Sequence, residues 1–414
     1  MRKLLLAASV LALGACGFSG TDGQEEGEAN TTASTQQSDN LADTMASADY
    51  GARGEVPDIP DSEQRPMMQA QVTLDRLGFG PGVIDGKMGM STRNALQGFQ
   101  EANGLQVSGE MDEATRQALS GGQQFAATRV VRIPQDWGQQ VYTAIPEDPA
   151  EKARLERLGY TSLDERLAER FHTTVDVLKS LNPNGQPAGM AAQGGGTQGA
   201  ATPAQRTASP SPTPTPTGTR SGTASPTPTG SATPAVFQPG QLVRVPNIGG
   251  DRVVPGAVTD ENWQRTLVDL GVGSEQPKVA RVVVSKAEKT LKAYDSDDKL
   301  VALFTVSSGS SKNPLPLGDW EINGVSFNPT YSYDPEVLDS VDDSDEKYQF
   351  PAGPNGPVGV VWIDLSKEHY GIHGTPEPQT IGRAQSDGCV RLTNWDAARL
   401  GQMVDGSTKV EFIA

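Results

Sequence analysis

The chain contains very little cysteine and histidine for its length. Among 414 residues there are two cysteines, Cys16 and Cys389, and three histidines, His172, His369 and His373. Because structural zinc sites take four Cys or His ligands, such a site is hard to assemble here, and we expect neither a metal nor a cofactor. Basic residues are also few: 34 Lys and Arg stand against 51 Asp and Glu, a formal net charge of −17. That balance argues against nucleic acid as a partner, because its phosphates require a basic surface.

The first residues have the pattern of a bacterial export signal. Arg2 and Lys3 precede an apolar run at 4–13 that is too short for a permanent membrane span. The run ends in LGAC at 13–16, which resembles the lipobox of bacterial lipoproteins. The resemblance implies that residues 1–15 are removed, that Cys16 is acylated and that the lipid anchors the protein in a membrane. Gly17 follows the cysteine in place of an acidic residue, which by the same analogy implies the outer membrane. The alternative is an ordinary signal peptide with a chance cysteine.

A tether is expected after the lipid-attachment site. Residues 16–65 are acidic, rich in Ser, Thr, Gln and Gly, and without apolar periodicity. This composition predicts disorder. A flexible segment of about 50 residues has a root-mean-square reach of roughly 40 Å. Such a reach suits a membrane-anchored protein that acts at a distance from its anchor.

The sequence pattern of residues 66–121 predicts a small three-helix bundle. Ser91 or Thr92 is the expected cap of the second helix, and Asp112 that of the third. The segments LDRLGF, VIDGKMG, NALQGFQEANGL and VSGEMDEATRQAL resemble the peptidoglycan-binding domain found at the ends of bacterial wall hydrolases. The resemblance implies binding to the cell wall. A generic three-helix module is the alternative.

A second module is predicted in two pieces within 151–249. Two helices are expected in 151–182, and together with FQPGQLVRVP at 237–246 they resemble a split LysM module, a small α+β unit that binds glycan. The pieces are separated by a low-complexity insert at 186–236, rich in Ala, Gly, Thr, Ser and Pro and expected to be extended. Because this insert departs from the compact LysM pattern, a structural brace is the alternative to sugar binding. His172 is expected to be a packing residue.

From Lys278 onward the pattern changes to short strands separated by tight turns. Residues 279–284 form a β-branched run, and further apolar segments follow at 291–294, 300–306 and 358–365. The pattern predicts a mostly-β sheet or sandwich of about 135 residues as the C-terminal domain. The whole chain is therefore expected to be multidomain.

A cysteine and a histidine near the C-terminus form a candidate catalytic pair. His373 stands in YGIHG at 370–374, and Cys389 follows sixteen positions later. A cysteine nucleophile needs a base that takes its proton, and His373 can be that base. If Cys16 carries lipid, Cys389 has no disulfide partner, which favours a reactive thiol over the alternative of a buried, inert cysteine. His369 is the rival base, because in an extended strand it would share a face with His373. The glycine after His373 favours His373.

Residues around Cys389 supply the other groups that such a nucleophile needs. The string SDGCVR at 386–391 places the backbone N–H groups of Gly388 and Cys389 where they can form an oxyanion hole. Ser386 is a candidate for a supporting hydrogen bond. Arg391 is a candidate for holding the thiolate or a substrate carboxylate.

The pattern HG…S-x-G-C-x-R resembles the signature of the L,D-transpeptidase catalytic domain. The resemblance spans 276–414 and includes NPLPLGDWEI at 313–322 and GPNGPVG at 353–359. It implies that Cys389 is the nucleophile, that His373 is the proton donor and acceptor, and that the carbonyl of Gly374 orients the histidine. Ser386, Gly388 and Arg391 would support them. One departure is Asp387, where many members have histidine; it is expected to affect the choice of acyl acceptor and to leave the Cys–His pair intact.

The same resemblance implies a reaction on peptidoglycan. A thioester acyl-enzyme would form on tetrapeptide stems, and an amine of a second stem or of an outer-membrane protein would resolve it. Two alternatives are an L,D-carboxypeptidase that uses water, and a non-catalytic tether between membrane and wall. The expected partners are peptidoglycan stem peptides and glycan, and a membrane through the N-terminal lipid. The expected location is the periplasm, anchored to the outer membrane.

Overall fold

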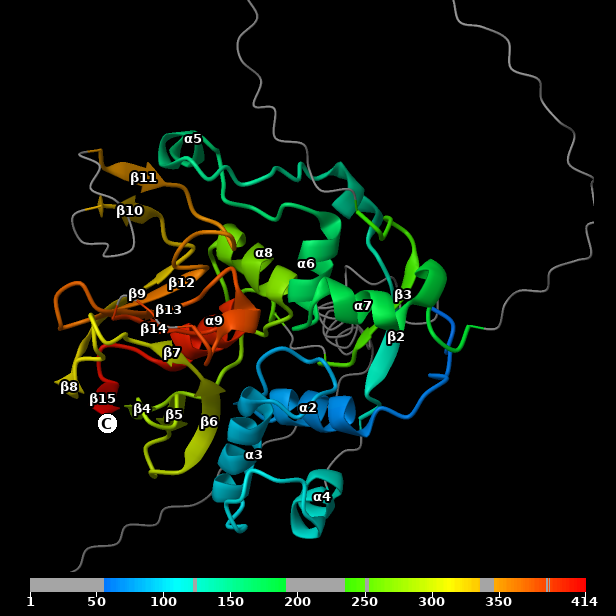
Figure 1. Ribbon diagram of the computed structural model, residues 1–414, viewed down its shortest axis with the longest axis horizontal. Coiled ribbons are helices and arrows are strands. Elements are labelled where there is room, and N and C mark those ends of the chain that lie inside the picture. Colours follow the sequence, from blue (N-terminus) through cyan, green and yellow to red (C-terminus); the bar gives the residue numbers. More distant parts are fainter. Residues whose placement is uncertain are drawn as a thin grey trace, which may run out of the picture. The chain divides into compact units, whose positions relative to one another are not determined.

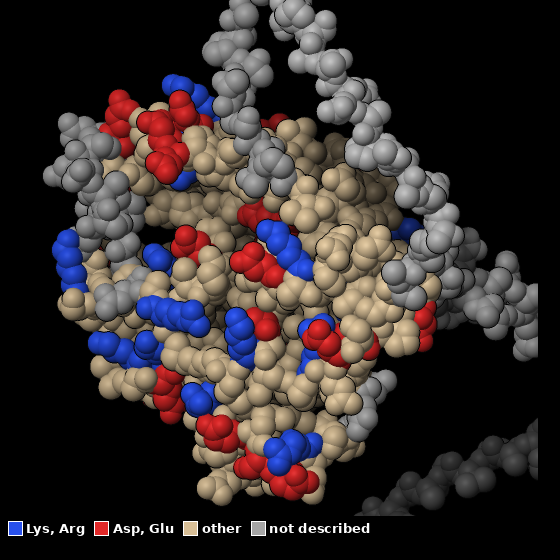
Figure 2. Space-filling view, turned by 45° about the vertical axis from the view of Figure 1, so that its right-hand side comes forward, with Lys and Arg blue, Asp and Glu red and all other residues tan. Residues whose placement is uncertain are grey.

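The computed structural model describes residues 56–121, 125–190, 235–249, 253–335, 346–384, 386 and 388–414 (Figure 1). Within these ranges, no helix combines the length and the apolar character needed to cross a bilayer. The export signal, Cys16, most of the predicted tether and residues 191–234 of the predicted insert lie outside the described residues. On the face shown in Figure 2, both acidic and basic side chains are present among the other residues.

The N-terminal module contains three helices, α2 (Pro66–Arg76), α3 (Met90–Ala102) and α4 (Glu113–Ser120). Helix α4 begins as expected, because the Asp112 side chain accepts a hydrogen bond from the backbone N–H of Thr115 at 2.8 Å. The expected cap of α3 was wrong. That helix begins one residue before Ser91, with Gly89 as its N-cap and without a side-chain cap. The Thr92 hydroxyl instead accepts a hydrogen bond from the Gln71 amide at 3.0 Å, which fixes α2 against α3.

The three helices share their core with the C-terminal domain. Strand β1 (Phe79–Gly80) pairs in parallel with β6 (Leu300–Thr305), where Phe79 lies opposite Leu303. Helix α3 crosses the same strand, and at Gly98 a Cβ atom would lie only 2.8 Å from the Leu303 Cβ. This close approach requires glycine, because any side chain would push the helix off the strand. The bundle is therefore docked on the sheet that contains β6 and is not a separate body.

The second module is a β-α-α-β unit. Strand β2 (Thr128–Arg132) pairs antiparallel with β3 (Leu242–Pro246), and α6 (Leu163–Arg170) and α7 (Val175–Leu181) pack on the pair. Each helix has the cap that its sequence offers: Ser162 and Thr174 accept hydrogen bonds from the backbone N–H three residues onward. Strand β2 lies before residue 151, so the sequence pattern missed one edge of this unit. A short helix, α5 (Pro149–Ala153), precedes α6.

In its described residues, the C-terminal domain is mostly β, with two large sheets and two α-helices around one core. The six-stranded sheet has the order β1-β6-β5-β4-β15-β8 and the five-stranded sheet the order β7-β14-β13-β12-β9. A separate hairpin pairs β10 with β11. The helices are α8 (Glu261–Leu270) and α9 (Asn394–Met403). The remaining strands are β4 (Arg281–Ser285), β5 (Thr290–Tyr294), β7 (Ser307–Ser308), β8 (Gly318–Trp320), β9 (Ile322–Phe327), β10 (Tyr331–Tyr333), β11 (Tyr348–Phe350), β12 (Val361–Leu365), β13 (Gly371–His373), β14 (Val390–Arg391) and β15 (Lys409–Ile413).

A buried polar cluster joins the three modules. The Asp75 carboxylate at the end of α2 accepts two hydrogen bonds of 3.0 Å from the Arg399 guanidinium of α9. The His172 imidazole contacts Asp75 Oδ1 at 3.1 Å and stacks on Trp395 with ring centroids 4.8 Å apart. His172 is fully buried, which agrees with a packing role. Burial would raise the pKa of Asp75, but Arg399 and His172 outweigh it and hold that pKa well below its usual range.

Replacing Arg399 with alanine should destabilise the protein strongly. The change leaves a buried carboxylate without its guanidinium partner, and breaking a buried ion pair in this way costs roughly 3–5 kcal/mol. Because folding lowers the pKa of Asp75, the ion pair stabilises the folded protein fully at any pH above the ordinary aspartate pKa. This stabilisation is lost in strong acid, where Asp75 becomes protonated. Urea denaturation at neutral pH measures the free energy of unfolding.

The matched control is Arg116→Ala, since Arg116 pairs with Glu113 on the exposed surface of α4. That variant should have nearly the same unfolding midpoint as the parent. A comparable, small loss in both variants would contradict the role of the buried cluster.

Candidate active site

His373 of the predicted pair ends strand β13, and Cys389 directly precedes the neighbouring strand β14. Strands β13 and β14 pair in parallel, with Ile372 opposite Val390 and His373 opposite Arg391. Cys389 directly precedes Val390, and its residue is partly exposed. The parallel pairing of two short strands therefore brings together residues that are sixteen positions apart in the sequence (Figure 1).

The His373 ring is held in one tautomer by the backbone. Its Nδ1 atom lies 2.7 Å from the carbonyl oxygen of Gly374. A carbonyl only accepts, so Nδ1 carries the proton and Nε2 is left as an acceptor. The ring is 4% exposed and stacks on Trp362, with centroids 5.6 Å apart. The Gly374 carbonyl, which the family resemblance implies as the group that orients the histidine, is thus the hydrogen-bond acceptor of His373 Nδ1.

The surroundings keep His373 neutral. Burial is the main cause, and the nearby charge of Arg391 adds to it; together they lower the pKa of His373 to about 4. A neutral imidazole at neutral pH can accept a proton from a thiol. The protonated form becomes favourable only when a negative charge, such as a thiolate, forms beside it.

Ser386 fixes the turn that carries the cysteine. Its hydroxyl oxygen accepts hydrogen bonds from the backbone N–H groups of Gly309 at 2.7 Å and Gly388 at 3.3 Å, and it donates to the carbonyl of Cys389 at 2.5 Å. Gly388 has φ +114° and its Cα faces the Tyr370 ring, so a side chain there would collide with the tyrosine. The Gly388 N–H proposed for an oxyanion hole thus has a long hydrogen bond within the turn. Asp387 lies outside the described residues.

His369, the alternative base, is not buried in a strand as His373 is. Strand β13 begins at Gly371, so His369 does not share an extended face with His373. His369 instead lies in a turn with φ +64°, its side chain is 70% exposed, and its ring is 3.6 Å from Glu368. The backbone carbonyl of His369 lies 3.6 Å from the Cys389 Sγ atom.

Two aromatic residues of the site escaped the sequence analysis. Trp362 covers one face of the His373 ring, and Tyr370 packs on Gly388. In VWIDL at 361–365, Trp362 and Asp364 alternate with aliphatic residues, and this is a sequence signal that Trp362 faces away from the core. The sequence does not reveal that Trp362 lies opposite His373, because that register is set by pairing between strands.

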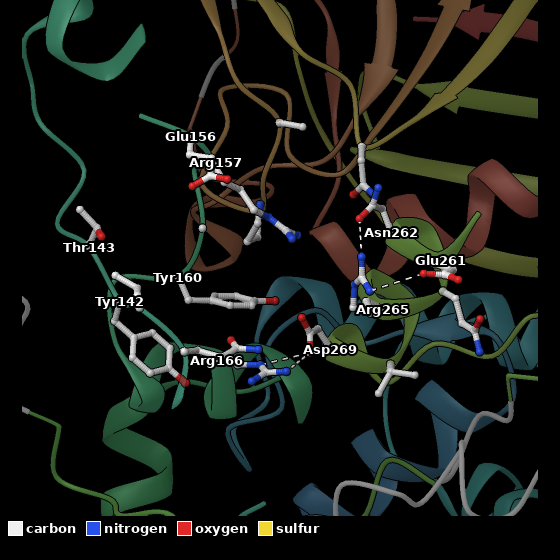
Figure 3. A pocket seen from close by; sticks show the side chains of 18 of the residues that line it. Tyr142, Thr143, Glu156, Arg157, Tyr160, Arg166, Glu261, Asn262, Arg265 and Asp269 are labelled. Carbon is white, nitrogen blue, oxygen red and sulfur yellow. Dashed lines mark hydrogen bonds and ion pairs between the residues drawn. The ribbon is translucent and has the colours of Figure 1, made fainter. Parts of the chain in front are cut away.

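The cavity in Figure 3 lies elsewhere. It has a volume of about 1080 Å³ and is bounded by the second module, α8 and the end of β9; neither Cys389 nor His373 lines it. Tyr160 extends into it, and Arg166 forms an ion pair with Asp269 at its floor. Among the residues that the structure describes, no three His, Cys, Asp or Glu side chains gather as a metal-binding group.

Comparisons with known proteins match two segments of the chain to known domain families. Residues 279–412 match the "L,D-transpeptidase catalytic domain" model named YkuD, and residues 64–119 match a "Putative peptidoglycan binding domain". The chain is 30% identical over 165 residues to "Putative L,D-transpeptidase YkuD" of Bacillus licheniformis, which covers 40% of this chain and 79% of that protein. The chain belongs to the YkuD family of L,D-transpeptidases.

Other members of the family are less fully covered. "Probable L,D-transpeptidase ErfK/SrfK" of Escherichia coli is 31% identical over 136 residues, which cover 32% of this chain and 43% of that protein. The crystal structure of L,D-transpeptidase 3 from Mycobacterium tuberculosis has a TM-score of 0.27 and 19% identity, covering 34% of this chain and 62% of that one. The predicted resemblances to the L,D-transpeptidase catalytic domain and to the peptidoglycan-binding domain are confirmed. The LysM-like module and the lipoprotein signal stay predictions.

Within this L,D-transpeptidase domain, the two histidines should differ sharply in function. His373→Ala removes the buried acceptor and should lower turnover of a tetrapeptide substrate by roughly 10²–10⁴, the usual effect of a positioned base. His369→Ala is the control and should have a small effect, because that side chain is exposed. Initial rates of both variants decide the assignment, and a reversed order would overturn it.

Proposed function

We propose that this chain is a cysteine-dependent peptidoglycan L,D-transpeptidase that acts on tetrapeptide stems through a thioester. One observation carries the proposal: a buried, neutral His373, fixed by the Gly374 carbonyl at 2.7 Å, belongs to the strand beside Cys389. A neutral base on the strand next to a partly exposed cysteine fits what nucleophilic cysteine catalysis needs. The match of 279–412 to the L,D-transpeptidase catalytic domain supports the same reaction class.

In the first half of the reaction, His373 Nε2 takes the proton of the Cys389 thiol. The thiolate attacks the carbonyl carbon between diaminopimelate and the terminal D-Ala, and the C–N bond of that peptide breaks. The leaving amine of D-Ala takes the proton back from His373. The product on the enzyme is a thioester between Cys389 and the remaining tripeptide stem. The negative charge of the tetrahedral intermediate is stabilised by backbone N–H groups of the turn at Gly388 and Cys389, with Arg391 nearby.

In the second half, an amine attacks the thioester. His373 accepts a proton from that amine, the C–S bond breaks, and the proton returns to the Cys389 sulfur. An amine from a second stem gives a 3-3 cross-link, and an amine of an outer-membrane protein attaches that protein to the wall. Water in the same place gives L,D-carboxypeptidase activity. A non-catalytic tether is disfavoured, because it would need neither His373 nor Cys389.

The other modules fit a protein that works on the wall. The match of 64–119 to a peptidoglycan-binding domain supports peptidoglycan as the substrate. The β2-α6-α7-β3 order of the second module supports a LysM-like unit interrupted by the insert, with glycan as its ligand. The export signal and the LGAC pattern support a periplasmic protein whose Cys16 carries lipid in the outer membrane.

Cys389→Ala should abolish cross-linking and leave folding intact. The side chain is small and partly exposed, so its loss opens little cavity. We expect no cross-linked product, no tripeptide and no free D-Ala by mass spectrometry after incubation with tetrapeptide stems. Free D-Ala and tripeptide without cross-links from the parent enzyme would establish the carboxypeptidase. Retained turnover in the variant would refute the cysteine mechanism.

Cys16→Ala should prevent lipidation and leave the protein soluble in the periplasm or unprocessed.

A second variant, which tests the tether, keeps Cys16 and lacks most of residues 17–55. It should act normally on soluble stems and poorly on intact wall, because effective concentration collapses when a tether cannot span the gap to its target. Fractionation, palmitate labelling and digestion of the modified wall test both. Equal action of the shortened protein on intact wall would refute the tether.

A further inference from the structure

Asn394 lies directly behind the backbone that orients the catalytic histidine. It is the first residue of α9 and is fully buried. A Cβ atom at Gly374 or at Gly359 would overlap with the Asn394 Oδ1 atom. The two glycines therefore leave a space that the asparagine side chain fills. The same Gly374 offers its carbonyl to His373 Nδ1 at 2.7 Å, so a shift of Asn394 moves the group that holds the base.

Three hydrogen bonds fix the Asn394 side chain. Its Oδ1 atom accepts from the backbone N–H of Val360 at 3.3 Å, and its Nδ2 group donates to the carbonyl of Pro354 at 3.1 Å. The shortest is the third: Nδ2 donates to Glu169 Oε1 at 2.8 Å. Glu169 belongs to α6 of the second module, 225 positions earlier in the chain. Glu169, which lies outside the catalytic domain, thus accepts the third hydrogen bond that holds the Asn394 side chain.

Glu169 is partly buried, and other acidic groups lie near its carboxyl group. Burial is the largest influence and raises the pKa of Glu169 to about 7, while hydrogen bonds from Asn394 and Tyr160 oppose it. The nearby charges of Glu165 and Asp269 raise it further, and Asp269 is itself paired with Arg166. A carboxyl group held here against its desolvation suggests a role beyond filling space.

We propose that Glu169 is a positioning residue for the catalytic base: it holds Asn394 against Gly374, and through the Gly374 carbonyl it orients His373. The second module thereby completes the active site of the catalytic domain. This inference rests on the proposed role of His373. It assigns α6 a function in the transpeptidase reaction that needs no contact with glycan.

A pair of substitutions separates positioning from packing. Glu169→Gln keeps a carbonyl oxygen that can accept from Asn394, whereas Glu169→Leu has similar volume and no acceptor. We expect the Leu variant to lower kcat about tenfold or more, with little change in KM, because the base and not substrate binding is disturbed. The Gln variant should stay within about threefold of the parent, since a neutral acceptor gives a weaker bond than a carboxylate.

The pH dependence gives a readout that simple docking would not change. Because the pKa of Glu169 is about 7, its carboxylate is mostly ionised at pH 8.5, where the hydrogen bond from Asn394 is charge-assisted. At pH 5.5 the carboxyl group is mostly neutral and resembles glutamine. The ratio of parent to Gln turnover should therefore rise from about 1 at pH 5.5 to about 3 at pH 8.5. A ratio that is flat across this range would overturn the inference, even if the Leu variant fails to fold.

Asp269→Asn is the matched control at the same interface. It removes the partner of Arg166 between α6 and α8 without touching Asn394. Its turnover at pH 8.5, where Glu169 is ionised with or without the Asp269 charge, should match that of the parent. A loss at that pH as large as that of Glu169→Leu would show that general docking of the module is what matters and would refute positioning. Thermal unfolding of every variant checks that the fold is retained.

Alkylation of Cys389 by iodoacetamide separates this inference from the proposed function, because it needs no substrate. The full-length protein is labelled at pH 7 and the adduct is located by peptide mapping. Labelling in Glu169→Leu should be several times slower than in the parent and in Glu169→Gln, since a misoriented His373 stabilises the thiolate less. Equal rates in all three refute the positioning role. A parent that labels normally but shows no Cys389-dependent turnover refutes the proposed function alone.

Discussion

The ion pair between Asp75 and Arg399 is the constraint around which the three modules are arranged. Two charges are removed from water where α2 meets α9, and each is satisfied by the other through two hydrogen bonds of 3.0 Å. His172 closes the cluster from the second module, and its Nε2 atom contacts the carbonyl of Leu270 at 2.8 Å. Buried charges tolerate little displacement, because separating them exposes each to an apolar surrounding. The described part of this enzyme is therefore one packed unit and not a string of loosely linked domains.

Helix α9 connects this buried polar cluster to the candidate active site. Arg399 and Trp395 face the junction, while Asn394 at the start of the same helix fills the space behind Gly374. The helix follows β14 after two residues, so its position and that of the Cys389 turn are set together. A buried, neutral His373 and a partly exposed Cys389 would then meet the opposite needs of the proposed reaction: a dry base and an accessible nucleophile.

Local patterns in the sequence predicted a large part of this arrangement. The string around Cys389, the histidine with its following glycine, and the cap at Asp112 depend on residues a few positions apart. The relative placement of modules could not be read in this way. Strand β1 is two residues long, and its pairing with β6 joins residues 224 positions apart. Strand β2 was missed for the same reason, since its partner β3 follows only after the insert. The N-cap of α3 was misplaced because Thr92 makes its hydrogen bond with another helix.

The central claim is that Cys389 carries the acyl group between the two halves of the reaction. Intact-protein mass spectrometry of the full-length chain, quenched in acid during incubation with a tetrapeptide stem, tests it most directly. The account predicts an increase equal to the mass of the stem without its terminal D-Ala, less one water, as expected for a thioester. Peptide mapping should locate it at Cys389, with free D-Ala in solution. An acyl group on another residue, or turnover with an unmodified Cys389 throughout, would contradict the account.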